Sequence, residues 1–420
     1  MDKILINGGN QLNGTVKVSG SKNSALPILF ATLLTDEKCK ISNVPFLADI
    51  TTTLNFLNFI GKKAYRTDNS DVIVESTNKL DYKAPYDLVR KMRASVLVMG
   101  PILARLGKVE VSLPGGCAIG ARPIDIHLDA FKQMGASIEL KEGYINLSAK
   151  KGLNGADIEF RYASVGATEN VMLAGVLAKG TTRIINAAKE PEIKDLADIL
   201  NKMGAKVSGA GTKIITIEGV NSLHGVEHKV IPDRIETATY MIAAAITKGN
   251  ITLTDVCPDH IEIITEKLIQ AGLEVDVEKD TINAKWVNDL NPVNIKTDIY
   301  PGFPTDVQAQ WMALMALTKG NCIVEETVFE NRFLHVCELQ RLGADLKIDG
   351  RSVYVSGVKK LSGAPVMVSD LRAGAALVLA GLCAQGKTEI SRIYHLDRGY
   401  EKLEEKFSLL GAKIERIKGN

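Results

Sequence analysis

Cys117 is the residue of this chain whose surroundings best suit covalent or acid–base chemistry. It lies in residues 113–123, where three glycines and two prolines disfavour regular structure. Arg122 follows it by five residues, and a nearby cation favours the thiolate form of a cysteine. The bland alternative for a lone cysteine is an inert, buried side chain. No apolar alternation around Cys117 indicates burial, so we interpret it as a chemically active thiol.

The other five cysteines are predicted to be structural and inert. No C-x-x-C pair occurs in the chain, so neither a zinc knuckle nor a thioredoxin-type site is indicated. Dispersed, reduced thiols and the lack of a secretory signal lead us to expect a cytoplasmic protein. These cysteines are Cys39, Cys257, Cys322, Cys337 and Cys383.

Positive charge recurs where apolar helices are predicted to begin. Lys22, Arg93, Arg234 and Arg372 each lie in or near such a first turn. A cation there opposes the helix dipole at a cost of about 0.3–1 kcal/mol, but it suits a site that binds an anion. A second set of helices is predicted to begin at Asp49, Arg122–Pro123, Glu190–Pro191, Pro258–Asp259, Asn331–Arg332 and Asp397–Arg398.

Convergence of these helix starts would line a cleft with cations suited to phosphate and carboxylate. Any single arginine is more simply explained as a salt-bridged or solvated side chain, and it is the recurrence that favours the cleft. The cations are Lys22, Arg93, Arg122, Arg234, Arg332, Arg372 and Arg398.

Asp306 is the acidic exception among the apolar helix starts. It follows Phe303, Pro304 and Thr305, which form a rigid approach and a cap. Its position fits an ordinary carboxylate stabilised by the helix dipole, and it fits a general base equally well. The residues alone leave both interpretations open.

Histidines and glycine motifs point to no metal ion or nucleotide cofactor. His127 and His395 lie near helix starts but are interpreted as structural, and no ligand spacing resembles a metal site. Neither a P-loop nor a G-x-G-x-x-G fingerprint occurs. We therefore expect no cofactor and no metal.

Six copies of one module supply these helix starts. Two sets of glycines mark the copies, one at intervals of 68 to 74 residues. Each copy is predicted to hold a buried apolar helix, a short strand, an amphipathic helix and further strand. The first set is Gly61, Gly135, Gly204, Gly272, Gly343 and Gly411; the second is Gly107, Gly180, Gly249, Gly320 and Gly386.

The six modules are expected to form an α/β protein of two domains with three modules each. We place the first domain at residues 22–229 and the second at residues 1–21 together with 230–420. In this prediction the N-terminal strands complete the second domain.

Composition excludes several classes of function. The 420 residues carry 51 basic and 49 acidic side chains, so no bulk positive charge favours nucleic acid. Aromatic residues make up 5% of the chain, which disfavours stacking on single strands. No apolar run reaches the ~18 residues of a membrane span. We expect small-molecule substrates, no nucleic-acid or membrane partner, and a monomer.

The chain closely resembles the UDP-N-acetylglucosamine 1-carboxyvinyltransferase (enolpyruvyl transferase) family along its whole length. The resemblance rests on Gly20-Ser-Lys-Asn-Ser-Ala-Leu-Pro27, Pro114-Gly-Gly-Cys-Ala-Ile-Gly-Ala-Arg-Pro123, Phe303-Pro-Thr-Asp306, Val328-Phe-Glu-Asn-Arg-Phe333 and Asp397-Arg-Gly-Tyr400. It implies two domains of βαβαββ-like units around buried helices, an inside-out α/β barrel, with the active site in the interdomain cleft.

The resemblance also implies a reaction. The enolpyruvyl group of phosphoenolpyruvate passes to the 3′-hydroxyl of UDP-N-acetylglucosamine, with release of phosphate, as the first committed step of peptidoglycan synthesis. By the same resemblance, Cys117 donates a proton, forms an adduct with phosphoenolpyruvate and is alkylated by fosfomycin. Asp306 accepts the hydroxyl proton, while Lys22, Arg122 and Arg398 hold phosphoenolpyruvate and the tetrahedral intermediate.

The remaining roles carried by the resemblance are substrate contacts. Those to UDP-N-acetylglucosamine are Asn23, Arg93, Arg122, Pro123, Ile124, Asp125, Ile126, Ser164, Val165, Gly166 and Val328. Those that complete the cleft are Asp49, Glu190, Arg234, Glu330, Arg332, Asp370 and Arg372.

The chain departs from the family pattern at two places. Phe46 and Ala48 stand in a connection where members of the family often carry lysine. Arg161-Tyr162-Ala163 stands in a second stretch where some members carry a lysine and this chain has none. The cleft is therefore expected to depend less on those cations. Two alternatives stay open: a 5-enolpyruvylshikimate-3-phosphate synthase-like transferase, which Cys117 disfavours, and a non-catalytic repeat protein that binds nucleotide sugars.

Overall fold

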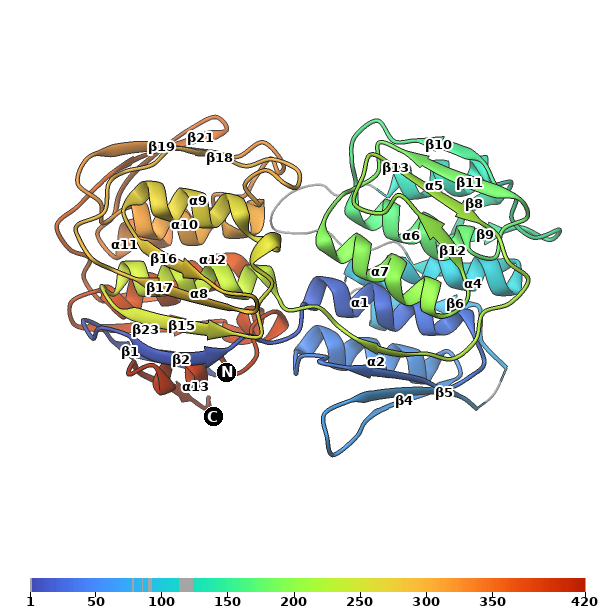
Figure 1. Cartoon of the computed structure of the whole chain (residues 1–420), viewed down its shortest axis with the longest axis horizontal. Helices are drawn as coiled ribbons and strands as arrows, with labels where there is room; N and C mark the ends of the chain where they lie inside the picture. The colour runs from blue at the N-terminus through green and yellow to red at the C-terminus, as the bar shows by residue number, and fades with distance from the viewer. Residues whose placement is uncertain (1, 78, 85, 90–92, 113–123, 420) are drawn as a thin grey trace. The chain divides into compact units, whose positions relative to one another are not determined.

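The structure, a computed structural model, describes residues 2–77, 79–84, 86–89, 93–112 and 124–419 (Figure 1). The described residues form two compact units. The first unit comprises residues 20–112 and 124–231, and the second comprises residues 2–19 and 232–419. Each unit has a hydrophobic core of its own.

Three four-stranded sheets with one common order build the first unit. In each sheet the first two strands are parallel and the other neighbours are antiparallel. The strands, in sheet order, are β14 (Glu227–Lys229), β3 (Cys39–Ser42), β5 (Val72–Ser76) and β4 (Lys62–Arg66); β6 (Lys83–Ala84), β7 (Lys108–Ser112), β9 (Tyr144–Ser148) and β8 (Ser137–Lys141); β10 (Asp157–Glu159), β11 (Thr181–Ile185), β13 (Ile214–Glu218) and β12 (Lys206–Ser208).

The helices of the first unit pack against these sheets in the order that the repeat predicts. In two of the three sheets helices link the strands of the parallel pair, whereas in the third the buried helix precedes β3 and its parallel partner β14 comes from the end of the unit. In all three sheets a second helix leads to the antiparallel strands. The helices are α1 (Lys22–Ala31), η1 (Thr32–Leu34), α2 (Ala48–Phe59), α3 (Tyr86–Val89), η2 (Arg93–Val98), α4 (Met99–Leu106), α5 (Asp125–Gln133), α6 (Val165–Gly175) and α7 (Pro191–Lys202).

The second unit repeats this arrangement with two strands taken from the N-terminal segment. β2 pairs with β15, and β1 lies between β23 and β24. The strands, in sheet order, are β2 (Asn13–Lys17), β15 (Asn250–Thr254), β17 (Thr281–Lys285) and β16 (Glu274–Val277); β18 (Ile295–Lys296), β19 (Asn321–Glu325), β21 (Ser352–Ser356) and β20 (Asp345–Asp349); β22 (Pro365–Met367), β23 (Lys387–Ser391), β1 (Lys3–Asn7) and β24 (Lys413–Ile417).

Three helices form the centre of the second unit. α8, α10 and α12 contact one another, and strands surround them in Figure 1. Almost every residue of these three helices is buried, which explains why their sequences are apolar on all sides. All helical elements of the second unit, the short 3-10 helices included, are α8 (Arg234–Ile246), η3 (Pro258–His260), α9 (Glu262–Ala271), η4 (Thr305–Val307), α10 (Gln308–Met315), α11 (His335–Arg341), α12 (Leu371–Cys383), η5 (Ile393–Arg398) and α13 (Leu403–Leu409).

The glycine markers end helices as the sequence predicts. Gly107 follows α4 and Gly272 follows α9, both in the left-handed conformation, with φ of 68° and 105°. Glycine adopts this conformation without the steric cost that a β-carbon brings. The left-handed backbone after these two helices therefore explains why the repeat has glycine there.

Three local predictions are wrong. Arg332 lies in a turn before α11, which begins at His335. Arg398 ends η5 rather than beginning a helix, because Arg416 binds the carboxylate of Asp397 and leaves it no capping role. Cys337 is exposed on α11 and not buried.

Strand β1 provides a test of the second unit. Ile6 is fully buried in this central strand, so Ile6→Ala should lower the free energy of unfolding by about 2–5 kcal/mol, since it deletes buried methyl groups and leaves a cavity. Both tryptophans, Trp286 and Trp311, belong to the second unit, so their fluorescence in urea reports its unfolding. The matched control is Asn7→Ala, which is exposed in the same strand. Equal midpoints for both variants would contradict a central place for β1.

Candidate active site

Asp306 lies at the start of the α10 segment with a guanidinium on each carboxylate oxygen. Pro304 leads into the short helix η4, which carries Asp306 and continues into α10. Arg332 Nη2 donates to Asp306 Oδ1 at 2.8 Å. Arg372 donates to Asp306 Oδ2 through Nη2 at 2.9 Å and Nε at 3.2 Å. We call these three residues the Asp306 clamp.

The clamp keeps Asp306 ionised. Burial acts to raise the pKa of this carboxyl, but the charges and hydrogen bonds of Arg372 and Arg332 outweigh it and hold the pKa well below its usual range. Asp306 retains 27% of its side-chain exposure, whereas Arg332 and Arg372 retain 7% and 3%. The carboxylate is therefore the member of the clamp that a ligand reaches most easily.

A buried glutamate supports Arg332, and sequence reasoning missed it. Arg332 Nη1 donates to Thr305 Oγ1 at 2.8 Å, and that hydroxyl donates to Glu326 Oε2 at 2.7 Å. The other oxygen, Glu326 Oε1, accepts from Thr297 Oγ1 and from the Val328 amide, each at 2.9 Å. Glu326 is fully buried, so it fixes the loop that carries Val328. Its acidity directly after strand β19 was the available signal.

The N-terminus of α12 positions Arg372. Asp370 caps this helix by accepting from the amides of Arg372 and Ala373 at 3.0 and 3.1 Å. The guanidinium of Arg372 lies over the ring of Tyr400, 5.5 Å from its centroid. The capped helix and the aromatic ring thus hold Arg372 against Asp306.

Arg398 lies close in sequence to a residue that joins the same network. Tyr400 is buried, and its hydroxyl oxygen lies 2.9 Å from Thr239 Oγ1 and 3.2 Å from Gln310 Nε2. Gln310 Nε2 also donates to the carbonyl of Asp306 at 2.9 Å. The segment after η5 is therefore hydrogen-bonded to α8 and to α10, the helix that Asp306 leads into.

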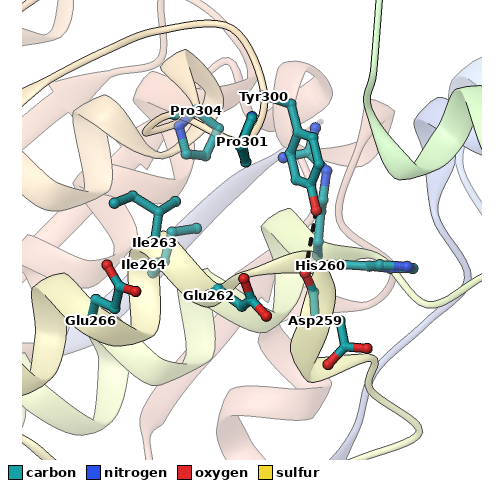
Figure 2. A pocket seen from close by; sticks show the side chains of 11 residues that line it. Asp259, His260, Glu262, Ile263, Ile264, Glu266, Tyr300, Pro301 and Pro304 are labelled. Atoms are coloured by element: carbon teal, nitrogen blue, oxygen red, sulfur yellow. Dashed lines mark hydrogen bonds between the residues drawn. The ribbon is translucent and has the colours of Figure 1, made fainter. Parts of the chain in front are cut away.

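Arg234 lies in a separate pocket of about 200 Å³ beside η3 and α9 (Figure 2). Its guanidinium lies 5.7 Å from the centroid of Tyr300, whose hydroxyl donates to the carbonyl of Asp259 at 3.2 Å. Asp259, Glu262 and Glu266 line the same pocket. These carboxylates favour a neutral or cationic group over phosphate, so an anion-binding role of Arg234 stays a prediction.

Glu330, another residue predicted to complete the cleft, is exposed on the loop that precedes Arg332.

Lys22 begins α1 in the first unit. Ser21 caps this helix by accepting from the Ser24 amide at 3.3 Å, and Lys22 Nζ lies 3.2 Å from Asp49 Oδ2 in the first turn of α2. Two predicted site residues are thus brought together from different helices. Asn23, the next residue of α1, is half-buried.

A buried network that sequence reasoning missed anchors the start of α1. Ser24 Oγ donates to Asp195 Oδ2 on α7, and Asp195 Oδ1 lies 2.8 Å from His228 Nε2 on β14. The backbone amide of Ile231 donates to Asp195 Oδ2 at 3.2 Å. Asp195 therefore ties the helix that carries Lys22 to the last strand of the first unit.

Six of the predicted nucleotide-sugar contacts lie at the starts of two helices, α5 and α6. Asp125 is in the first turn of α5 and pairs with Arg161, one of the departures from the family pattern. Ser164 caps α6 by accepting from the Ala167 amide at 3.4 Å, which leaves Val165 and Gly166 in the first turn of that helix. Ile124 precedes Asp125 as the N-cap residue of α5, and Ile126 follows it and is buried.

Glu190 lies within an acidic group. It precedes Pro191 at the start of α7. Burial, followed by the charges of Glu192 and Glu190, raises the pKa of Glu169 on α6 well above its usual range. Burial and the neighbouring carboxylates therefore disfavour the charged form of Glu169.

Four predicted site residues lie in or next to the parts of the chain outside the described ranges. Cys117, Arg122 and Pro123 lie outside the described residues, and Arg93 begins η2. Within the described ranges, no group of three or more histidine, cysteine, aspartate or glutamate side chains could hold a metal ion. None of the helices in the part of the chain that the structure describes has the length and apolar character to span a membrane.

Comparison with known proteins identifies the family. The family model for EPSP synthase (3-phosphoshikimate 1-carboxyvinyltransferase) matches residues 6–407. A protein of Endomicrobium trichonymphae named UDP-N-acetylglucosamine 1-carboxyvinyltransferase is 64% identical over 417 residues, covering 99% of this chain and 100% of the relative. One of the same name from Myxococcus xanthus (strain DK1622) is 54% identical, with 100% of both chains covered. The chain belongs to the UDP-N-acetylglucosamine 1-carboxyvinyltransferase family.

Solved structures agree with the enolpyruvyl transferase fold. The enolpyruvyl transferase NikO from Streptomyces tendae aligns with a TM-score of 0.90 at 26% identity, covering 100% of this chain and 99% of NikO. EPSP synthase from Acinetobacter baumannii aligns with a TM-score of 0.79 at 19% identity over 100% of both chains, a likeness of fold alone. The predicted fold class and family resemblance are confirmed.

The Asp306 clamp should shape the acid stability of this family member. Because the folded pKa of Asp306 lies below its unfolded value of about 3.9, its ionisation stabilises the fold above that value, and this contribution is lost as the pH falls through the folded pKa. We expect Asp306→Asn to lose less stability than the wild type between about pH 6 and about pH 3, measured by tryptophan fluorescence in urea. The exposed Asp276→Asn serves as control. An acid limb that Asp306→Asn leaves unchanged would contradict the clamp.

Proposed function

We propose that this protein transfers the enolpyruvyl group of phosphoenolpyruvate to the 3′-hydroxyl of UDP-N-acetylglucosamine and releases phosphate. The observation that carries the proposal is 64% identity, over nearly the whole of both chains, to a relative with that transferase name. The reaction would be the first committed step of peptidoglycan synthesis, and the protein would act in the cytoplasm as a monomer without a cofactor.

The proposed reaction is an addition followed by an elimination. The sugar hydroxyl attacks C2 of phosphoenolpyruvate while Cys117 protonates C3, which yields a tetrahedral intermediate. Loss of a proton from C3 and departure of phosphate then restore the double bond in the product. A positioned acid and a positioned base are therefore both needed.

Asp306 is the base in this proposal, and the clamp sets its strength. Arg332 and Arg372 keep the carboxylate ionised and able to accept a proton, but their charge also weakens it as a base. Anionic phosphoenolpyruvate beside the arginines would offset that charge and raise the proton affinity of Asp306. The 3′-hydroxyl of the nucleotide sugar would then be activated chiefly when phosphoenolpyruvate is also bound.

The binding roles of the other residues follow the family pattern. Lys22, Arg122 and Arg398 would hold the phosphate and carboxylate of phosphoenolpyruvate, with Cys117 as proton donor beside them. Residues of the first unit would bind the nucleotide sugar. The active site would lie between a domain at residues 22–229 and one formed by residues 1–21 and 230–420.

Substrate discrimination tests the reaction. A second candidate is transfer to shikimate 3-phosphate, which the matching family model names in its description. We expect phosphate release from phosphoenolpyruvate with UDP-N-acetylglucosamine and none above background with shikimate 3-phosphate, as measured by a phosphate-release assay. The reverse pattern would replace our proposal with the second candidate. Release with neither acceptor, from protein that still binds the nucleotide sugar, would favour a non-catalytic repeat protein.

Cys117 provides the second test. We expect Cys117→Ala to lower kcat by about 10²–10⁴-fold, the usual worth of a positioned proton donor. Cys117→Asp should retain part of the activity, because a carboxylic acid can also donate a proton.

Mass spectrometry identifies the thiol directly. Fosfomycin should add one alkyl group to Cys117 as its epoxide opens, and exposed Cys337 should stay unmodified as the internal control. Unchanged turnover of Cys117→Ala, or modification of Cys337 in preference, would exclude the proposed role.

A further inference from the structure

Arg416 on strand β24 holds Asp397, the residue immediately before Arg398. Its Nη2 donates to Asp397 Oδ1 at 2.5 Å, and its Nη1 donates to Asp397 Oδ2 at 3.1 Å. The same guanidinium donates to Glu404 through Nε to Oε1 at 2.5 Å and, more weakly, through Nη2 to Oε2 at 3.4 Å. Arg416 thus forms a two-point fork with Asp397 and a second, longer fork with Glu404 in the first turn of α13.

A two-point fork fixes direction as well as distance. The planar guanidinium and the planar carboxylate can form two parallel hydrogen bonds in one orientation, which a single bond does not enforce. Asp397 closes the short helix η5 together with Arg398, so holding the side chain of one restrains the backbone from which the other extends.

The next two residues are also restrained. A β-carbon on Gly399 would lie 2.5 Å from Leu371 Cδ2 at the start of α12, so the backbone there fits closely against that helix. Tyr400 is buried, and its hydroxyl lies 2.9 Å from Thr239 Oγ1. Arg398 is therefore set between Asp397, held by Arg416, and a segment packed against α12.

Stability alone is a weak reason for this fork. Arg416, Asp397 and Glu404 keep 26%, 36% and 15% of their side-chain exposure, and partly exposed ion pairs add little to folding free energy. Precise placement of a neighbouring group is worth more, since a shift of about 1 Å in a bound group can cost on the order of 10²-fold in rate.

We propose that Arg416 is a positioning residue that directs Arg398 toward the anionic substrate through its fork with Asp397. The inference rests on the proposed function, in which Arg398 holds phosphoenolpyruvate. Arg416 itself does not touch the substrate, and it acts through the backbone of η5. Glu404 also binds Arg416 but lies outside η5 and is not next to Arg398, so its variant separates positioning from general ion-pair stability.

Steady-state kinetics of matched variants test the proposal. Arg416→Met should raise the KM for phosphoenolpyruvate by about tenfold or more and leave the KM for UDP-N-acetylglucosamine unchanged. Arg416→Lys should behave similarly, since lysine keeps the charge but cannot form the fork. Glu404→Gln should leave both KM values unchanged, even where its melting temperature falls as far as that of Arg416→Met. Equal KM values in Glu404→Gln and Arg416→Met would overturn the inference.

A double-mutant cycle asks whether the effect passes through Arg398. In an Arg398→Lys background, Arg416→Met should cause no further rise in the KM for phosphoenolpyruvate, because groups that act through one contact are not additive. Fully additive effects would overturn positioning through Arg398.

A binding measurement separates this inference from the proposed function. Calorimetric titration with inorganic phosphate should give weaker binding to Arg416→Met than to Glu404→Gln, whatever reaction the protein catalyses. Equal phosphate affinity in the wild type and both variants would overturn the positioning role. A wild type that binds phosphate but releases none from phosphoenolpyruvate would overturn the proposed function instead.

Discussion

The pairing of one carboxylate with two guanidinium groups is the interaction on which the candidate site of the second unit depends. Arg332 and Arg372 are almost wholly buried, and a buried cation without a partner is strongly destabilising. Asp306 supplies the partner for both. The same contact keeps Asp306 ionised and lowers its basicity, so the requirements of folding and of proton transfer act on one group.

The buried helices explain how this contact is formed. Asp306 enters from the start of α10, and Arg372 enters from the start of α12, two helices that pack side by side. A helix N-terminus leaves backbone amides unpaired. Asp370 accepts from the amides of Arg372 and Ala373 and so holds the start of α12, from which the side chain of Arg372 reaches Asp306. At Lys22 and Arg372, cations that oppose the dipole are therefore tolerated because a carboxylate from another helical segment, Asp49 or Asp306, compensates them.

Local sequence patterns predicted much of the fold and the identities of the charged groups. Gly107 and Gly272 mark helix ends because a left-handed residue is a local requirement. Lys22 and Arg372 stand out because their charge opposes the helix dipole, and Asp306 stands out as the acidic exception among the cations at these helix starts. Glu326, Asp195 and Arg416 could not be assigned roles in the same way. Their partners come from other segments of the chain, and no local periodicity encodes such pairings.

The error at Asp397 shows where the local rule fails. An aspartate before a helix is normally interpreted as a cap, but its carboxylate can instead accept from a guanidinium that arrives from another strand. Here the carboxylate of Asp397 accepts from Arg416, and the next helix, α13, begins later at Leu403. The six modules share one backbone plan, and at Asp397 and Asp306 a guanidinium from a distant segment distinguishes the module. These long-range pairs thus differ between modules, while the repeated glycines and apolar helices recur in the framework.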